Sequence, residues 1–179
     1  MDNIRQRDFR VAVIVFAVLL LGAGAFVAVA IASGLYNIGA DAPHSRVVTF
    51  AIEQLRDRST QMRSRDIKVP PLDNVQMISE GAEHYEAMCS GCHLAPGMTE
   101  SEIRAGLYPQ PPNLVVDGID DPREAFWIVK HGIKMSGMPA WGKTHDDQAL
   151  WSIVAFLKLM PSMKPEAYRA MAGADDAEP

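Results

Sequence analysis

The chain has 179 residues, enough for one small domain with additional segments, and its 48% hydrophobic and 22% charged residues are ordinary globular proportions. Residues 1–69 hold nine Lys/Arg against six Asp/Glu, whereas residues 70–179 hold eight against sixteen. The downstream part is therefore acidic, and we expect no nucleic-acid partner. Only two cysteines are present, three positions apart, which excludes a framework of structural disulfides.

Residues 11–32, VAVIVFAVLLLGAGAFVAVAIA, contain no charged side chain. A helix of about 22 residues rises roughly 33 Å, which matches the hydrocarbon core of a membrane. Arg5, Arg7 and Arg10 precede it, and positive residues stay on the cytoplasmic side. We therefore expect a cytoplasmic N-terminus over 1–10 and a transmembrane anchor over 11–33. The alternative is a cleaved signal peptide, because Ala30-Ile31-Ala32 fits a cleavage site, although signal cores are shorter.

Residues 34–74 are predicted to form a connector that contains one helix at 46–65 between prolines. Several apolar residues fall loosely on one side of that helix, namely Val47, Phe50, Ala51, Leu55 and Met62. Arginines crowd its second half, at positions 56, 58, 63 and 65. The pattern fits a helix on lipid headgroups, a partner-binding helix or a solvated spacer. With part of it helical, the connector could reach on the order of 90 Å and let the following domain swing.

The segment 75–161 is predicted to be all-α, as short helices joined by loops, with no strand pattern. One helix is expected at about 75–88, with Asn74 or Asp73 as its N-cap. A capping-box pattern at 99–102 predicts a second helix that ends at Gly106. Asp121-Pro122 predicts a third, ending at Gly132, and a last helix should run from near Asp146 to before Pro161. Residues 162–179 are expected as a C-terminal tail, disordered from residue 173.

Cys89-Ser90-Gly91-Cys92-His93 is a C-x-x-C-H pattern, which is typical of covalent haem attachment. Two thiols at this spacing can join the two haem vinyl groups, and the imidazole that follows is a good iron ligand. A thioredoxin-type pair would need a βαβ setting, and a zinc site would need four ligands. We therefore expect one covalent haem c on Cys89 and Cys92, with His93 on the iron.

A second iron ligand is predicted about 45 residues downstream. Met138 stands between Gly137 and Pro139, which favours an irregular loop that could direct a thioether at the metal. Met135 is the close alternative, and a methionine packed in the core is the other interpretation. His131 could also ligate, but it falls at a predicted helix end. The predicted metal ligands are thus His93 and Met138.

Residues 75–161 resemble a class I c-type cytochrome domain. The matching stretches are Gly81…Tyr85 before the C-x-x-C-H pattern, then Gly137-Met138-Pro139-Ala140, then Leu150-Trp151-x-x-Val154-x-Phe156-Leu157. The resemblance implies an all-α fold around the haem, with first and last helices crossing at Gly81, and Tyr85 and Trp151 packing nearby. It also implies that the carbonyl of Pro96 accepts the N–H of the ligating histidine. The layout resembles mono-haem cytochromes tethered in bacterial respiratory chains.

Three functions follow as hypotheses. The first is an electron carrier at the periplasmic face of a bacterial inner membrane, relaying electrons between redox protein partners and making no bonds itself. The second is the haem subunit of a larger membrane oxidase or dehydrogenase. The third is an enzyme or gas sensor with an open iron position. Lys130, Lys134 and Lys143 flank the Met138 loop, and we hypothesise that they form a docking patch for an acidic partner.

Overall fold

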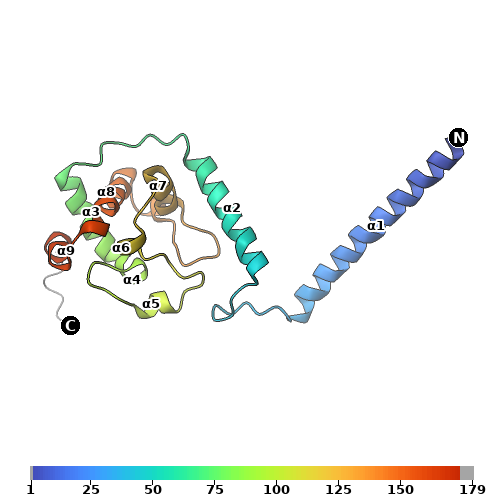
Figure 1. Cartoon of the computed structure of the whole chain (residues 1–179), viewed down its shortest axis with the longest axis horizontal. Coiled ribbons are helices and arrows are strands. Elements are labelled where there is room, and N and C mark those ends of the chain that lie inside the picture. The colour runs from blue at the N-terminus through green and yellow to red at the C-terminus, as the bar shows by residue number, and fades with distance from the viewer. Residues whose placement is uncertain (1, 174–179) are drawn as a thin grey trace. The chain divides into compact units, whose positions relative to one another are not determined.

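The computed structural model describes residues 2–173 of the chain, with side chains from Gln6 onward. The described residues fall into two compact units, one up to Ala42 and one from Pro43 onward. The first unit consists of helix α1 (Asp2–Ser33) and the turns that follow it (Figure 1). The part of α1 from Gln6 to Ser33 is long and apolar enough to cross a membrane. Its apolar side chains are exposed, as lipid contact requires.

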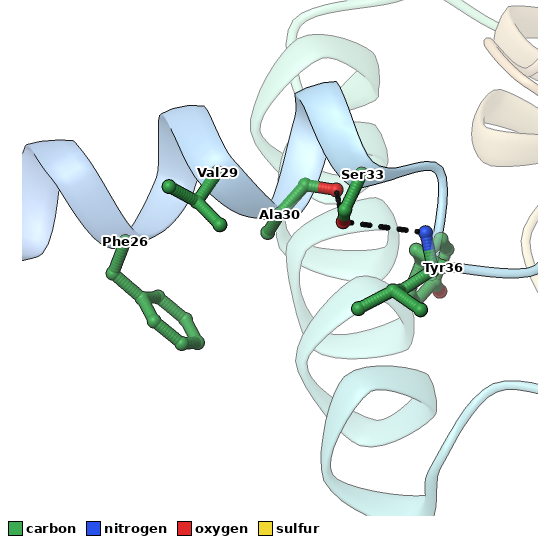
Figure 2. A pocket seen from close by; sticks show the side chains of 6 residues that line it. Phe26, Val29, Ala30, Ser33 and Tyr36 are labelled. Atoms are coloured by element: carbon green, nitrogen blue, oxygen red, sulfur yellow. Dashed lines mark hydrogen bonds between the residues drawn. The ribbon is translucent and has the colours of Figure 1, made fainter.

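The C-terminal end of α1 is held by its own hydrogen bonds. The Ser33 hydroxyl donates to the carbonyl of Ala30 at 3.0 Å and accepts from the Leu35 N–H at 3.4 Å. Beside this turn lies an apolar hollow, shown in Figure 2. Its lining residues are Phe26, Val29, Ala30, Ser33, Leu35 and Tyr36. An aromatic pair at the end of an apolar helix is typical of a membrane–water interface.

Every regular element that the structure describes in the second unit is helical (Figure 1). The elements are α2 (Arg46–Ser64), α3 (Val75–Met88), α4 (Ser90–His93), α5 (Glu102–Ala105), α6 (Leu114–Asp117), α7 (Pro122–His131), η1 (Trp141–Lys143), α8 (Asp147–Leu159), η2 (Met160–Ser162) and α9 (Pro165–Ala172). The all-α fold class predicted from the sequence is therefore confirmed.

The core lies where α3 crosses α8. Gly81 of α3 faces the backbone of α8 at Ser152. Because glycine has no side chain, the two helices can approach closely at this point. Tyr85 and Phe156 are fully buried at the crossing, with ring centroids 5.3 Å apart. On the other side of α8, Trp151 stacks on Phe126 of α7 at 4.1 Å between ring centroids. The implied crossing of first and last helices is thus confirmed.

Three side-chain caps fix where the main helices begin. Asn74, Asp121 and Asp146 each accept a backbone N–H from the first turn of α3, α7 and α8, at 3.0, 2.8 and 2.9 Å. The predicted starts and ends of these helices are confirmed. The second predicted helix is shorter than expected, because its cap is Ser101, whose hydroxyl accepts from the N–H of Arg104.

One segment is more structured than its sequence indicated, and the predicted helix at 46–65 is confirmed but packs on the cytochrome domain. Residues 165–172 of the expected tail form α9, which packs on α3 and buries Tyr168; the Tyr168 hydroxyl donates to the carboxylate of Glu86. Helix α2 of the expected connector packs on α7 and belongs to the same compact unit. The reach of the remaining link between α1 and α2 is accordingly much smaller than 90 Å. The disorder predicted for the end of the tail lies outside the described residues beyond 173.

Candidate functional site

The C-x-x-C-H segment sits where α3 ends at the core. Cys89 caps α3 with its N–H on the carbonyl of Tyr85 at 2.8 Å, and its own carbonyl accepts from Cys92 and His93 at 3.0 and 2.8 Å. These bonds wind residues 90–93 into the single turn α4. The turn places the second cysteine and the histidine one helical turn from the first cysteine, as attachment to one planar group requires.

The backbone reverses immediately after the histidine. Leu94 has φ of +64°, a conformation that leucine rarely adopts, and its side chain is buried. The Tyr85 hydroxyl donates to the Leu94 carbonyl at 2.6 Å and holds this geometry. Tyr85 therefore supports the site indirectly, because it holds the backbone turn that follows His93. Its position in the sequence, four residues before Cys89, does not indicate this role.

His93 is oriented by a backbone carbonyl. Its Nδ1 lies 3.1 Å from the carbonyl oxygen of Pro112. Because a carbonyl only accepts, Nδ1 carries the proton, and in the neutral ring Nε2 keeps a free lone pair. Burial lowers the pKa of His93, and the positive charge of Arg104 lowers it further, whereas the hydrogen bond to Pro112 raises it. The neutral ring is the form that ligates metals.

The resemblance had assigned that carbonyl to Pro96, and this assignment is wrong. Pro96 is buried directly after the reversal at Leu94, three residues from His93. The chain instead returns through the Tyr108–Pro112 segment, and Pro112 lies nineteen residues beyond the histidine. The reversal at Leu94 lies between His93 and Pro96, so nearness in the sequence does not bring the Pro96 carbonyl to the imidazole.

Cys89 lacks the lowered pKa of a redox-active thiol. Cys89 is buried, and burial together with Cys92 raises its pKa to about 12. Reactive thiols have lowered pKa values, so a thioredoxin-type function is disfavoured. Among the described residues, no group of three or more His, Cys, Asp or Glu side chains could hold a metal ion, which also disfavours zinc.

The loop that carries the two candidate methionines gives them different burial. It begins at Gly132, with φ of +65°, where a Cβ would stand 2.7 Å from the Met138 carbonyl. Two hydrogen bonds close the loop. The Ile133 N–H donates to the Met138 carbonyl at 3.2 Å, and the Met138 N–H donates to the Ser136 hydroxyl at 3.2 Å. Met138 packs against the core, whereas Met135 is 99% exposed with φ of +56°.

The comparisons with known proteins bear on this same region. The family model described as "Cytochrome C oxidase, cbb3-type, subunit III" matches residues 76–157. No match was found among curated proteins or among solved structures. The matched span begins in α3 and ends in α8, and so contains both crossing helices, the C-x-x-C-H turn and the methionine loop. Residues 76–157 form a c-type cytochrome domain.

The cytochrome domain binds haem c covalently and functions in electron transfer. One polar atom in the structure supports the fit of such a group. The Nε of Arg104 is buried and has no hydrogen-bond partner among the described residues. A buried guanidinium nitrogen without a partner is costly, and the carboxylates of haem are acceptors of the right charge. Arg104 also lies close enough to His93 to lower its pKa. The residues present are therefore compatible with haem.

The remaining sequence candidates lie around the cytochrome domain rather than in a second cluster. His131 is exposed and has its ring 4.9 Å from that of Trp127. Lys130, expected in a docking patch, is 2.6 Å from the carboxylate of Asp147, while Lys134 and Lys143 are exposed. The pairing of Lys130 weakens the docking-patch hypothesis, which stays a prediction for the other two. The sequence reasoning missed Arg104 and Pro112, because neither belongs to a motif.

Proposed function

We propose that the chain is a one-electron carrier whose haem c is attached through Cys89 and Cys92 and ligated by His93 and Met138. The observation that carries the proposal is the different burial of the two loop methionines. Met138 packs inward while Met135 is 99% exposed. The Pro112 carbonyl supports the other ligand, because it leaves Nε2 of His93 free to bind iron.

Haem c supplies the one-electron couple at this site. The imidazole of His93 is held in one tautomer by Pro112 and so keeps a fixed donor atom. The thioether of Met138 would be a soft ligand that favours the reduced state and raises the potential. If His93 and Met138 both held the iron, no ligand position would stay open for a substrate. The chain itself then makes and breaks no substrate bonds, and its task is to bind, orient and shield the cofactor.

Binding of small gases tests this proposal. The reduced full-length protein should bind carbon monoxide slowly and incompletely, because Met138 occupies the position that the gas needs. Met138→Ala should bind it readily, and Met135→Ala should behave like the wild type. Rapid, complete binding by the wild-type protein would instead indicate an open position and favour a haem enzyme or gas sensor.

We further propose a location for the carrier. Helix α1 anchors the chain in a bacterial inner membrane as a single span, with the cytochrome domain on the periplasmic side. The proposal is supported by the apolar span Gln6–Ser33 and by arginines at positions 5, 7 and 10 near its N-terminal end. Its partners would be redox proteins at that face of the membrane.

A second candidate is the haem subunit of a larger membrane oxidase. It is favoured by the family description, which refers to a subunit of a cytochrome oxidase. Purification from membranes in mild detergent distinguishes the two. A free carrier should elute alone, whereas a subunit should elute with haem proteins that consume oxygen.

A further inference from the structure

Helix α2 lies on the cytochrome domain with its polar side inward. Thr60 and Ser64 are its buried residues, at 3% and 2% exposure, and the helix packs on α7 (Figure 1). Both ends are held to the domain. The His44 N–H donates to the Tyr108 hydroxyl at 2.9 Å, and the Arg123 guanidinium donates to the Arg65 carbonyl at 3.4 Å. The helix is therefore fixed in orientation on the domain.

The apolar side of the same helix faces away from the domain. Val47, Leu55 and Met62 are 78%, 72% and 53% exposed. Further exposed apolar residues of α2 are Val48, Phe50 and Ile52. Helical spacing places Val47, Leu55 and Met62 opposite Thr60 and Ser64, whereas Phe50 lies nearer to the buried side. A surface helix ordinarily buries its apolar side, so α2 is oriented the reverse way, and among the described residues its apolar side stays exposed.

The charge around this apolar side is positive. Residues 46–65 contain five arginines against Glu53 and Asp57, whereas residues 70–179 hold twice as many acidic as basic residues. Arg56 and Asp57 form an ion pair, as do Arg65 and Asp66, and all four are substantially exposed. An exposed apolar side that also carries arginines fits the boundary between anionic headgroups and acyl chains.

The chain itself brings α2 to such a surface. Helix α1 ends at Ser33 and α2 begins at Arg46, so twelve residues join them. Fully extended, twelve residues span at most about 40 Å. If α1 crosses the membrane as proposed above, α2 can never be farther than that from the headgroups. The local concentration of lipid is therefore high, and weak binding suffices.

We infer that the outward side of α2 is a membrane-binding surface for anionic lipid headgroups. This inference rests on the proposed anchoring by α1. Because α2 is fixed on α7, and α7 leads through Gly132 into the Met138 loop, binding of α2 orients the haem site relative to the membrane. The cytochrome domain is then held at the surface in one orientation rather than swinging freely on a long connector.

Site-specific fluorescence on the full-length holoprotein tests the inference. Cys89 and Cys92 are consumed by haem, so a single introduced cysteine can carry an environment-sensitive dye. Leu55→Cys reports on α2, and Val116→Cys, 75% exposed on α6, is the matched control. In phosphatidylcholine vesicles containing phosphatidylglycerol, we expect a blue shift and loss of emission to a lipid-borne quencher at position 55 only. Quenching of the dye at position 55 should be weaker in vesicles of phosphatidylcholine alone.

A third labelled position separates membrane anchoring by α1 from lipid binding by α2. Val18→Cys lies in α1 and should report lipid in both kinds of vesicle. A lipid signal at 18 without one at 55 overturns the inference and leaves the anchor intact. Absence of a signal at both positions overturns the anchor. Dye self-quenching at 55 that grows with the protein-to-lipid ratio would make a second copy the occupant, and would also overturn the lipid assignment.

Charge variants complete the test. The double variant Arg58→Gln/Arg63→Gln should reduce the signal at position 55 in anionic vesicles. The reason is that the electrostatic attraction between these arginines and the anionic headgroups is lost. Val47→Glu should abolish the signal, whereas Val116→Glu should not. All these side chains are exposed, so the visible haem spectrum and the melting temperature should stay unchanged and show that the domain is folded. An unchanged signal in Val47→Glu would overturn the inference.

Discussion

Gly81 and Ser152 are in backbone contact: a Cβ atom on Gly81 would stand 1.9 Å from the carbonyl oxygen of Ser152. Real Cβ atoms do not approach so closely, and the neighbour is helical backbone rather than a flexible side chain. Helices α3 and α8 can cross at this distance only because residue 81 has no side chain. The same crossing buries Tyr85, which supports the turn after His93. Packing of the core and geometry of the site are thus linked through one glycine.

Gly81→Ala should therefore destabilise the domain strongly. The added methyl group forces α3 and α8 apart, which costs about 3 kcal/mol or more. Gly106→Ala is the matched control, since a Cβ there would make only ordinary contacts at 3.8 Å. Denaturant unfolding of the two holoproteins, followed by visible absorption, measures the difference. Equal stability of both variants would contradict the close crossing.

Haem attachment should depend on both cysteines. In Cys89→Ser/Cys92→Ser no thioether can form, and haem should be released from the denatured polypeptide in gel electrophoresis, where the wild type keeps it. Because the cofactor completes a small core, the variant should also be unfolded or degraded. Ser90→Ala, in the same turn, is the control and should keep covalent haem. A folded double variant without haem would contradict this account.

Replacement of the two loop methionines should have unequal effects. Met138→Ala should remove the weak red absorption band of a ferric iron–thioether bond. It should also lower the reduction potential, within the roughly 0.8 V over which axial ligands tune haem. Met135→Ala should change neither, because that side chain is 99% exposed. Optical titration against potential measures both properties, and the reverse pattern would move the ligand to Met135.

The helices of the cytochrome domain could be predicted because their signals are local. Asn74, Asp121 and Asp146 are capping residues at the start of periodic segments, and the structure uses each of them as a cap. The carbonyl on His93 could not be predicted, because a backbone acceptor leaves no trace in the sequence. The structure shows that the chain reverses at Leu94 and that residue 112, and not residue 96, reaches the imidazole.

Helix α2 illustrates a different limit. Its apolar side was visible in the sequence, but periodicity says which residues share a side and not what that side contacts. The usual rule would have buried Leu55, whereas the structure buries Thr60 and Ser64. Helix α9 was missed because the segment 165–172 is short and rich in alanine. Its anchoring residue, Tyr168, is recognisable only once α3 lies beside it.

Arg104 provides the last prediction. Its buried Nε has no partner among the described residues, and its charge helps lower the pKa of His93, so it lies near the ligand. A positive charge close to the iron disfavours the oxidised state, which carries one more positive charge than the reduced state. Arg104→Gln should therefore lower the reduction potential measured by optical titration, without removing covalent haem or the red absorption band.

Two further variants separate charge from packing. Arg104→Lys keeps the charge and should recover most of the potential, even though the planar guanidinium is lost. Arg169→Gln removes the same charge from an exposed position on α9 and should shift the potential much less, because solvent screens exposed charges. A higher ionic strength should diminish the effect of Arg104→Gln only slightly, because partly buried charges are poorly screened. If Arg104→Gln and Arg169→Gln shift the potential equally, the effect is one of net charge, and Arg104 has no special position beside the haem.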